Sequence, residues 1–340
     1  MKIKFKDTLK IEPDKYILAL DIPSAKLKKG IIISDSVRHS LRYRGLALVP
    51  TYENKMSSYN ILDQSISKKT FSNIQKTWDK LRQNEKIDKE LLSDSTNELV
   101  EDVMKKFGDV NYIPLVKLNS FDQYTYAHTL NVGLITLLMA IEMGFAKKDL
   151  YELTYAGLLH DIGKSRIDEK ILNAPRKLTD DEYNIVKQHV VFGKLICQEQ
   201  KIEGDILRGV YEHHERYDGH GYIAGKKGTE ISFYGRLISV ADVYDALTSK
   251  RAYKDMWNYY KVVSYILQNA GKIFDPEISS SFIKVFGVYP PGTIVKLNDS
   301  RTATVVAVRK GNELQPVVQV EDKIIDLSKE KFYIIQVIGE

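Results

Sequence analysis

The chain has 340 residues and a formal net charge of +5; 43% of its residues are hydrophobic and 28% are charged. This balance excludes an intrinsically disordered chain and leaves room for one large domain with one or two small ones. The positive charge suits a small anionic partner, but it is too small and too dispersed to indicate a DNA or RNA polymer.

Two absences bear on the compartment in which the chain works. The N-terminus lacks the apolar segment of a signal peptide, and the longest apolar run, 132–141, is about half of a membrane span. The single Cys197 allows no disulfide framework and is expected to be a core thiol in a reducing compartment. We therefore expect a cytoplasmic protein without a membrane segment.

Residues 1–108 are expected to form a small accessory domain with β-strands, followed by linking helices. Short β-like runs lie at 16–20, 31–33 and 46–50. His39, between Arg38 and Arg42, is interpreted as a surface residue. From about residue 68 the apolar period becomes helical, with Phe71, Ile74, Trp78 and Leu81 on one face. Residues 95–98 resemble a capping box ahead of a further helix. We interpret these charged helices as linking domains or pairing two chains into a homodimer.

Residues 109–288 are predicted to form an all-helical domain, and residues 289–340 a small β subdomain. Helices are expected near 125–143, 149–163, 180–200, 204–214, 231–248, 258–270 and 277–286. Thr179 and Glu182 form a capping-box signal at the start of the third of these helices. A glycine-rich interruption, 215–230, is too long for a simple turn. Strands are expected at 293–297, 302–308, 317–320 and 332–337. The expected fold class is therefore mainly α.

Six of the seven histidines lie within 93 residues of the helical domain, at positions that continue apolar stripes into the core. A single core histidine is usually satisfied by a backbone carbonyl. Five histidines and two aspartates buried on successive helices would be costly without a compensating multivalent cation. The seven candidates are His128, His160, Asp161, His189, His213, His214 and Asp242.

Imidazole and carboxylate donors without a thiolate suit iron, manganese or zinc. Seven ligands exceed one tetrahedral site but fit two adjacent divalent metal ions, with Asp161 as the most natural bridge. Such a site makes hydroxide available at neutral pH and polarises a phosphoryl oxygen, which favours displacement at phosphorus. Lys164 follows His160 by one helical turn, so its ammonium can offset charge developing on a phosphate. An ordinary lysine near a helix end is the alternative interpretation of Lys164.

The order of these residues resembles the HD-GYP family, a subclass of the HD superfamily of metal-dependent phosphohydrolases. The resemblance covers about 124–288. It rests on His160-Asp161-Ile162-Gly163-Lys164, on His189, on His213-His214-Glu215-Arg216-Tyr217-Asp218-Gly219-His220-Gly221-Tyr222, and on Val240-Ala241-Asp242-Val243-Tyr244-Asp245-Ala246-Leu247-Thr248. It implies a bacterial phosphodiesterase that hydrolyses cyclic di-GMP to pGpG, and on to GMP if a second cut follows, by attack of a bimetal-bound hydroxide on phosphorus.

The resemblance also implies roles for individual residues. The seven residues named above match the family's metal ligands, Asp161 and Lys164 its catalytic pair, and Lys164 also its contact with substrate. Asp218, Gly219, Gly221 and Tyr222 match the glycine-rich loop that shapes the substrate pocket. Arg251 and Lys254 match a segment that contacts the dinucleotide, and a basic pair suits a dianionic ligand. A solvated charged loop is the alternative for that pair.

Two departures from the family pattern carry predictions. Ile223 stands where the Gly-Tyr-Pro signature has proline, which predicts a looser loop and leaves the effect on turnover open. Tyr124 stands four residues before His128, where some members carry a glutamate that supports a third metal, so two metals are expected here. His220, at a variable loop position, is not expected to be a ligand. Two alternatives to the phosphodiesterase stay open: a cyclic dinucleotide sensor with little turnover, and an HD phosphohydrolase acting on another nucleotide.

Overall fold

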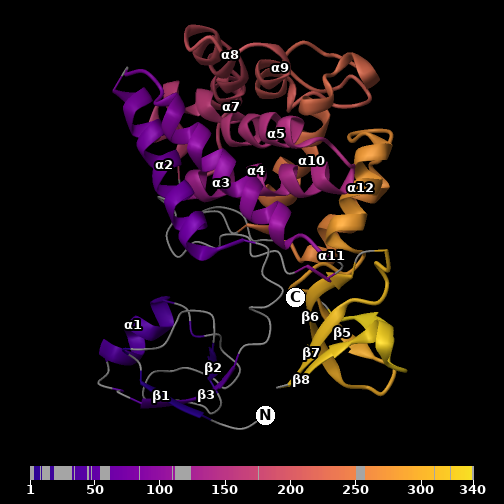
Figure 1. The fold of residues 1–340 in the computed structure, drawn as a ribbon. Helices are drawn as coiled ribbons and strands as arrows, with labels where there is room; N and C mark the ends of the chain where they lie inside the picture. The colour runs from indigo at the N-terminus through magenta and orange to yellow at the C-terminus, as the bar shows by residue number, and fades with distance from the viewer. Residues whose placement is uncertain are drawn as a thin grey trace.

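The helices between residues 64 and 286 form one body, with a small β-containing unit toward each end of the chain (Figure 1). The computed structural model describes residues 4–7, 9, 16–18, 33, 35–43, 46, 48–53, 62–83, 85–108, 110–111, 124–174, 176–249, 257–309, 311–321 and 323–338. No helix in these ranges is both long and apolar enough to cross a membrane.

The N-terminal unit is a three-stranded antiparallel sheet with one helix. Its elements are β1 (Lys4–Asp7), β2 (Tyr16–Leu18), α1 (Asp35–Tyr43) and β3 (Leu48–Glu53), with β3 in the centre of the sheet. The strands predicted at 16–20 and 46–50 are confirmed as β2 and β3, whereas β1 and α1 were not predicted. Most of the run predicted at 31–33 lies outside the described residues. His39 is exposed on α1, as expected.

Helices α2 (Gln64–Arg82) and α3 (Lys89–Lys106) share one hydrophobic core with the helical domain that follows them. Residues Ile74, Trp78 and Leu81 of the predicted face are buried in that core. The capping box predicted at 95–98 is wrong. Asp88 caps α3 by accepting a hydrogen bond from the Leu91 N–H, so residues 95–98 lie inside the helix.

The helical domain is built around α4 (Tyr124–Glu142), which packs against α5 (Lys147–Leu159), α10 (Phe233–Thr248) and α12 (Pro276–Phe286). Around them lie α6 (Glu169–Leu172), α7 (Asp180–Lys187), α8 (His189–Glu199), α9 (Gly204–Glu212), α11 (Tyr259–Gln268) and the short 3₁₀ helices η4 (Ile162–Arg166) and η5 (Gly228–Glu230). The predicted helix 149–163 ends at Leu159, and η4 takes over. The predicted helix 180–200 divides at Gln188, and the Thr179–Glu182 capping box at its start is confirmed.

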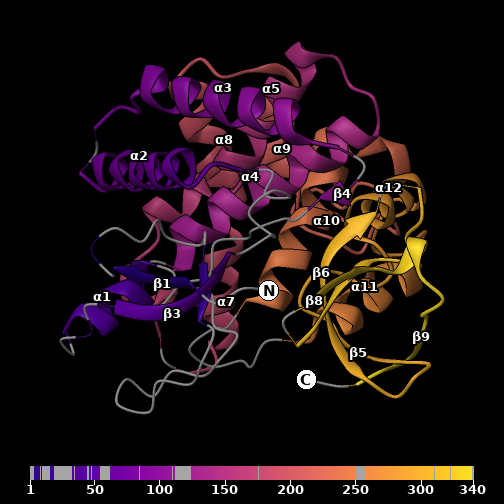
Figure 2. The ribbon, with the colours of Figure 1, turned by 60° about the horizontal axis from the view of Figure 1, so that its bottom comes forward.

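The C-terminal unit is an antiparallel sheet in the order β8-β7-β6-β5-β9, with the short strand β4 (Val110–Asn111) paired to β6 (Figure 2). Its other strands are β5 (Ile294–Leu297), β6 (Thr302–Arg309), β7 (Val317–Val320), β8 (Lys323–Asp326) and β9 (Ile334–Val337). Four of these five were predicted; β8 was not. The segment that leads into the helical domain is thus tied to the C-terminal sheet.

Candidate metal centre

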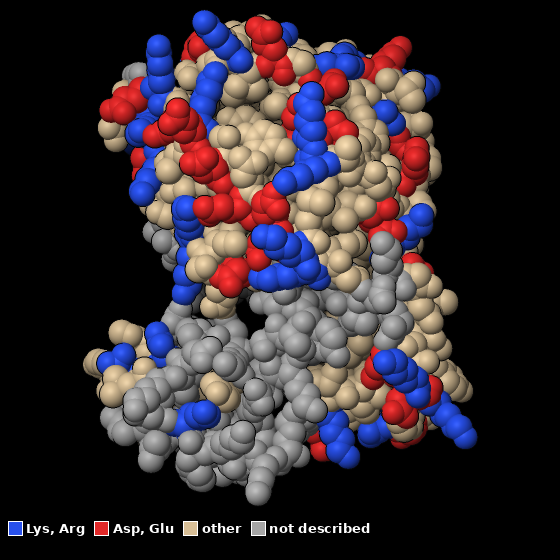
Figure 3. Space-filling view, viewed as in Figure 1, with Lys and Arg blue, Asp and Glu red and all other residues tan. Residues whose placement is uncertain are grey.

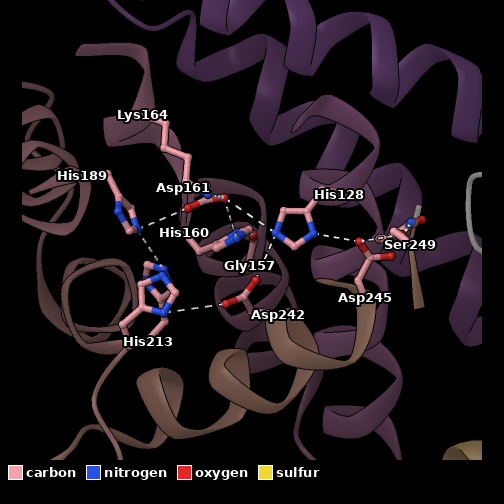
Figure 4. A network of polar contacts seen from close by, with 12 residues as sticks. His128, Gly157, His160, Asp161, Lys164, His189, His213, Asp242, Asp245 and Ser249 are labelled. Atoms are coloured by element: carbon pink, nitrogen blue, oxygen red, sulfur yellow. Dashed lines mark hydrogen bonds and ion pairs between the residues drawn. The ribbon is translucent and has the colours of Figure 1, made fainter. Parts of the chain in front are cut away.

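Ends of several helices meet in the middle of the helical domain and bring the seven candidate ligands together (Figure 4). His128 comes from the second turn of α4, His160 and Asp161 from the end of α5, and His189 from the start of α8. His213 and His214 follow α9, and Asp242 lies within α10. Six of the seven are buried, and the side chain of His214 is 24% exposed.

The seven side chains form two groups, each with ligand atoms within 4.8 Å of one another and able to hold a metal ion. One group is Asp161, His189, His213 and His214; the other is His128, His160 and Asp242. Asp161 faces both. Its Oδ1 lies 3.3 Å from His189 Nε2, while its Oδ2 lies 3.3 Å from His160 Nε2 and 3.7 Å from His128 Nε2. This placement fits the bridging position predicted for Asp161.

Three of the histidines are each oriented by the end of the helix that precedes them, α5, α7 or α9. The Nδ1 atoms of His160, His189 and His213 lie 2.7–2.9 Å from the carbonyl oxygen of the residue three positions earlier. A ring nitrogen so placed carries the proton and donates a hydrogen bond to the carbonyl. Nε2 is then unprotonated and is directed into the cluster as a metal-ligand atom. The helix ends therefore select the tautomer that a metal needs.

His128 is oriented differently, by two residues that sequence reasoning missed. Its Nδ1 lies 2.7 Å from Asp245 Oδ2, and Asn131 Nδ2 donates to Asp245 Oδ1 at 2.7 Å. Its Nε2 lies 3.1 Å from Asp242 Oδ1. Asp242 and Asp245 are one turn apart on α10 and so contact opposite nitrogens of the same ring. The three-residue spacings Asp242–Asp245 and His128–Asn131 were the available sequence signal.

The buried environment sets the charges of the cluster. Burial lowers the pKa of His189 to about 3 and that of His214 to about 4, so both rings are neutral at pH 7. Burial also opposes charge on His128, but its contacts with Asp242 and Asp245 outweigh this and raise its pKa to about 9. Burial opposes charge on Asp161 too, yet Lys164 and His160 hold the pKa of Asp161 well below its usual range. His189 and His214 are thus in the neutral form that binds divalent metals beside ionised carboxylates, whereas His128 would release a proton on binding one.

Two atoms of the cluster support a metal directly. His160 Nε2 and Asp161 Oδ1 are buried and have no hydrogen-bond partner in the described part of the chain. Such atoms are costly to bury, because both lose their contacts with water. Cations held by the two groups would satisfy both atoms, and the imidazole and carboxylate donors fit iron, manganese or zinc.

Lys164 lies on η4, and its ammonium contacts Asp161 Oδ2. Its side chain is 24% exposed, so the charge lies between the buried cluster and the surface. Gly163, between these two residues, faces the backbone of α8 at His189 and Gly193. Any side chain there would separate η4 from α8.

The predicted substrate loop is shaped mainly by Glu215, another residue that the sequence did not single out. Its buried carboxylate accepts from the N–H groups of Ala224 at 2.7 Å, Gly225 at 3.1 Å and Lys226 at 3.1 Å. Gly219 has a φ of +84°, and a Cβ at Gly221 would lie 2.4 Å from Glu215 Cα. Both glycines are therefore required by the backbone of the loop.

The other predicted substrate residues lie in different settings. Tyr222 stacks on His214 with ring centroids 4.8 Å apart, next to the first group of ligands. The Asp218 carboxylate is bound by Arg216 and by the His220 N–H. The His220 side chain is 79% exposed and belongs to neither ligand group. Arg251 and Lys254 lie outside the described residues, as does the side chain of Tyr124.

Comparison with known proteins agrees with this geometry. Residues 113–278 match the family model of the HD domain. The chain is 34% identical over 240 residues to the cyclic di-GMP phosphodiesterase PA4108 of Pseudomonas aeruginosa, a match that covers 70% of this chain and 57% of that protein. It is 35% identical over 193 residues to a cyclic di-GMP phosphodiesterase of Thermotoga maritima, covering 54% of this chain and 52% of that one. The helical domain thus matches the HD domain, and these relatives support its resemblance to the HD-GYP family.

A solved structure has a similar fold. Bd1817 of Bdellovibrio bacteriovorus, described as an HDG"Y"P protein, aligns with a TM-score of 0.50 at 13% identity, over 83% of this chain and 98% of that one. At this identity the likeness concerns the fold alone. The chain spans between half and three fifths of the length of the two curated relatives above.

Proposed function

We propose that this protein is a metal-dependent phosphodiesterase that hydrolyses cyclic di-GMP to pGpG. The observation that carries the proposal is the pair of His/Asp groups joined by Asp161, within a sequence related to proteins named cyclic di-GMP phosphodiesterases. The substrate is a dianion, and in the described part of the chain the Lys164 ammonium lies beside the two groups, where it can contact a phosphate. On the face shown in Figure 3, positive and negative side chains are interspersed over the helices.

The proposed centre holds two divalent ions, iron or manganese, with His189, His213 and His214 on one side and His128, His160 and Asp242 on the other. When bound, these ions lower the pKa of water and polarise a phosphoryl oxygen. The cyclic di-GMP phosphate would lie beside Asp161, where the Lys164 ammonium can offset charge that develops on its oxygens.

The remaining residues would act by placing the substrate. Tyr222 extends the ring surface of His214 and offers a stacking face to a base. The loop held by Glu215 brings Gly219 and Gly221 beside it, and Arg251 with Lys254 would neutralise the second phosphate. Three domains, 1–108, 109–288 and 289–340, remain our proposed division of the chain, although α2 and α3 pack into the helical core.

The test is product chromatography after anaerobic loading with Fe²⁺ or Mn²⁺, with metal content measured on the same sample. We expect pGpG and about two metals per chain, following the two ligand groups. His160→Ala combined with Asp161→Ala should abolish turnover, whereas His39→Ala, which removes an exposed histidine on α1, should not.

The same experiment separates the alternatives. If the metal-loaded wild type binds cyclic di-GMP but forms no product, the proposed phosphodiesterase activity is refuted and a sensor role is supported. Faster hydrolysis of another cyclic dinucleotide in a substrate panel would refute the proposal that cyclic di-GMP is the preferred substrate. A ratio near three metals per chain would contradict the two-metal centre.

A further inference from the structure

Helix α2 contacts the elements that carry both ends of the metal site, and nothing in the proposed chemistry uses this contact. It packs against α4, which carries His128, and against η4, which carries Lys164. The residues of α2 that make this contact include Phe71 and Trp78, which lie on the apolar face predicted from the sequence. They contact the first turn of α4.

Tyr126 lies in that first turn, two residues before His128, and α2 surrounds it. Its ring makes edge contacts with Phe71 and Trp78, each at a centroid distance of 6.0 Å. Its hydroxyl accepts a hydrogen bond from Arg82 Nη1 at 3.0 Å and donates to Asp79 Oδ1 at 3.4 Å. Only 6% of Tyr126 is exposed. One side chain of α4 is thus held by two aromatic rings and two polar groups of α2.

Arg82, the last residue of α2, makes a second connection. The same Nη1 atom lies 3.0 Å from Glu169 Oε1. Glu169 begins α6, immediately after the segment that runs from Lys164 out of η4. A single guanidinium therefore joins the end of α2 to the start of α4 and to the exit of η4.

These contacts matter because of where they lie along the helix. The first turn of a helix has N–H groups without intrahelical partners and frays when nothing holds it. His128 is in the second turn of α4, and its Nε2 must stay directed toward Asp242. The Arg82–Glu169 pair is 28% and 58% exposed, so its own Coulomb energy is small. Its effect is therefore expected in the geometry of the site more than in overall stability.

We propose that Arg82 and Tyr126 are positioning residues, through which α2 holds His128 and Lys164 at their working separation. Helix α2 would then belong to the catalytic unit, and a displacement of α2 by the N-terminal part of the chain would change metal affinity and turnover. This inference rests on the proposed function for its effect on turnover, but not for its effect on metal binding.

The test compares Arg82→Ala, Arg82→Lys and Tyr126→Phe with Lys69→Ala in the full chain. Lys69 lies on the same helix, and its 2.6 Å ion pair with Glu98 ties α2 to α3 instead of to the site. The measurements are Mn²⁺ affinity by titration calorimetry, thermal unfolding, and kcat and KM with cyclic di-GMP. Removing residues that orient metal ligands costs about 10–100-fold in metal affinity.

We expect Arg82→Ala to lower Mn²⁺ affinity by about 10-fold, at the low end of that range because Arg82 acts through Tyr126. It should lower kcat more than it raises KM. Tyr126→Phe should show a smaller loss, Arg82→Lys partial recovery, and Lys69→Ala wild-type affinity. Equal affinity in Arg82→Ala and Lys69→Ala would overturn the proposal, even if both unfold at a lower temperature. If the wild type turns over no substrate while Arg82→Ala still binds Mn²⁺ more weakly, the proposed function fails and this inference stands.

Discussion

Gly163→Ala is the substitution for which the structure sets the clearest cost. Gly163 lies on η4 between Asp161 and Lys164, and η4 packs directly on α8. A Cβ at this position would lie 1.9 Å from the His189 carbonyl oxygen and 2.3 Å from the Gly193 nitrogen. Both atoms belong to the backbone, so no side-chain rotation can relieve the contact. The two elements must separate by about 1 Å to reach the closest distance that a Cβ tolerates.

The magnitude follows from this separation. Overpacking a close contact costs about 1–3 kcal/mol, and each kcal/mol lowers the melting temperature of a domain of this size by about 2–4 °C. We therefore expect Gly163→Ala to melt about 2–12 °C below the wild type. Because α8 begins at His189, the same shift moves a proposed ligand, and Mn²⁺ affinity should fall as well.

The assay is thermal unfolding with and without Mn²⁺, beside the matched variant Gly108→Ala. Gly108 is exposed, and among the described residues its Cβ would meet only the Lys106 carbonyl oxygen, at 3.8 Å. Its substitution should change stability by less than about 0.5 kcal/mol. If the two variants melt together and bind Mn²⁺ equally, the close approach of η4 and α8 does not control the site.

Three further outcomes are expected. Asp245→Asn should weaken Mn²⁺ binding by about 10-fold or more, since it disturbs the acceptor that orients His128; unchanged affinity by calorimetry would remove Asp245 from the site. Cys197 should not react with a thiol reagent at pH 8 until the chain unfolds, because burial raises its pKa to about 12. The thiol of the unfolded chain ionises near pH 9, so the free energy of unfolding should fall above that pH. Rapid labelling of the native chain would contradict the burial of Cys197. Thr179→Ala should cost about 1 kcal/mol in urea unfolding through loss of the capping box with Glu182, and no change would mean that the cap is dispensable.

The sequence predicted the helices of the central domain well because their apolar faces repeat over long stretches and are buried in one core. Its errors lie where local signals compete. Residues 95–98 carry a cap pattern, but the Ser95 and Thr96 hydroxyls instead donate to carbonyls one turn back, at Leu91 and Leu92. Asp88 is the N-cap of the helix, although no glutamate follows it at the position that would complete a capping box. Short elements such as α1 and β8 have too few residues for a helical or strand repeat of apolar residues to be recognised in the sequence.

The candidate site divides in the same way. Most of the proposed ligand positions were predictable because the residue continues a buried apolar stripe of the adjoining helix; at His189 the stripe residue, Ile185, lies on α7 and is 45% exposed. The carbonyl that orients His160, His189 or His213 lies three residues away on the same chain segment. Contacts between helices distant in sequence carry no such signal. The pairing of His128 with Asp245 spans 117 residues, and that of Arg82 with Tyr126 spans 44.

The difference has a physical consequence for how the site is built. His160, His189 and His213 can take the correct tautomer as soon as the helices that precede them form, because their acceptors are local. His128 acquires its orientation only when α4 packs against α10 at Asp245 and against α2 at Tyr126. The half of the centre formed by His128, His160 and Asp242 therefore depends on tertiary packing more than the half formed by Asp161 and the other three histidines. A mutation that loosens α2 or α10 should weaken the His128 half first, and metal titrations of such variants should show one affinity lost while the other remains.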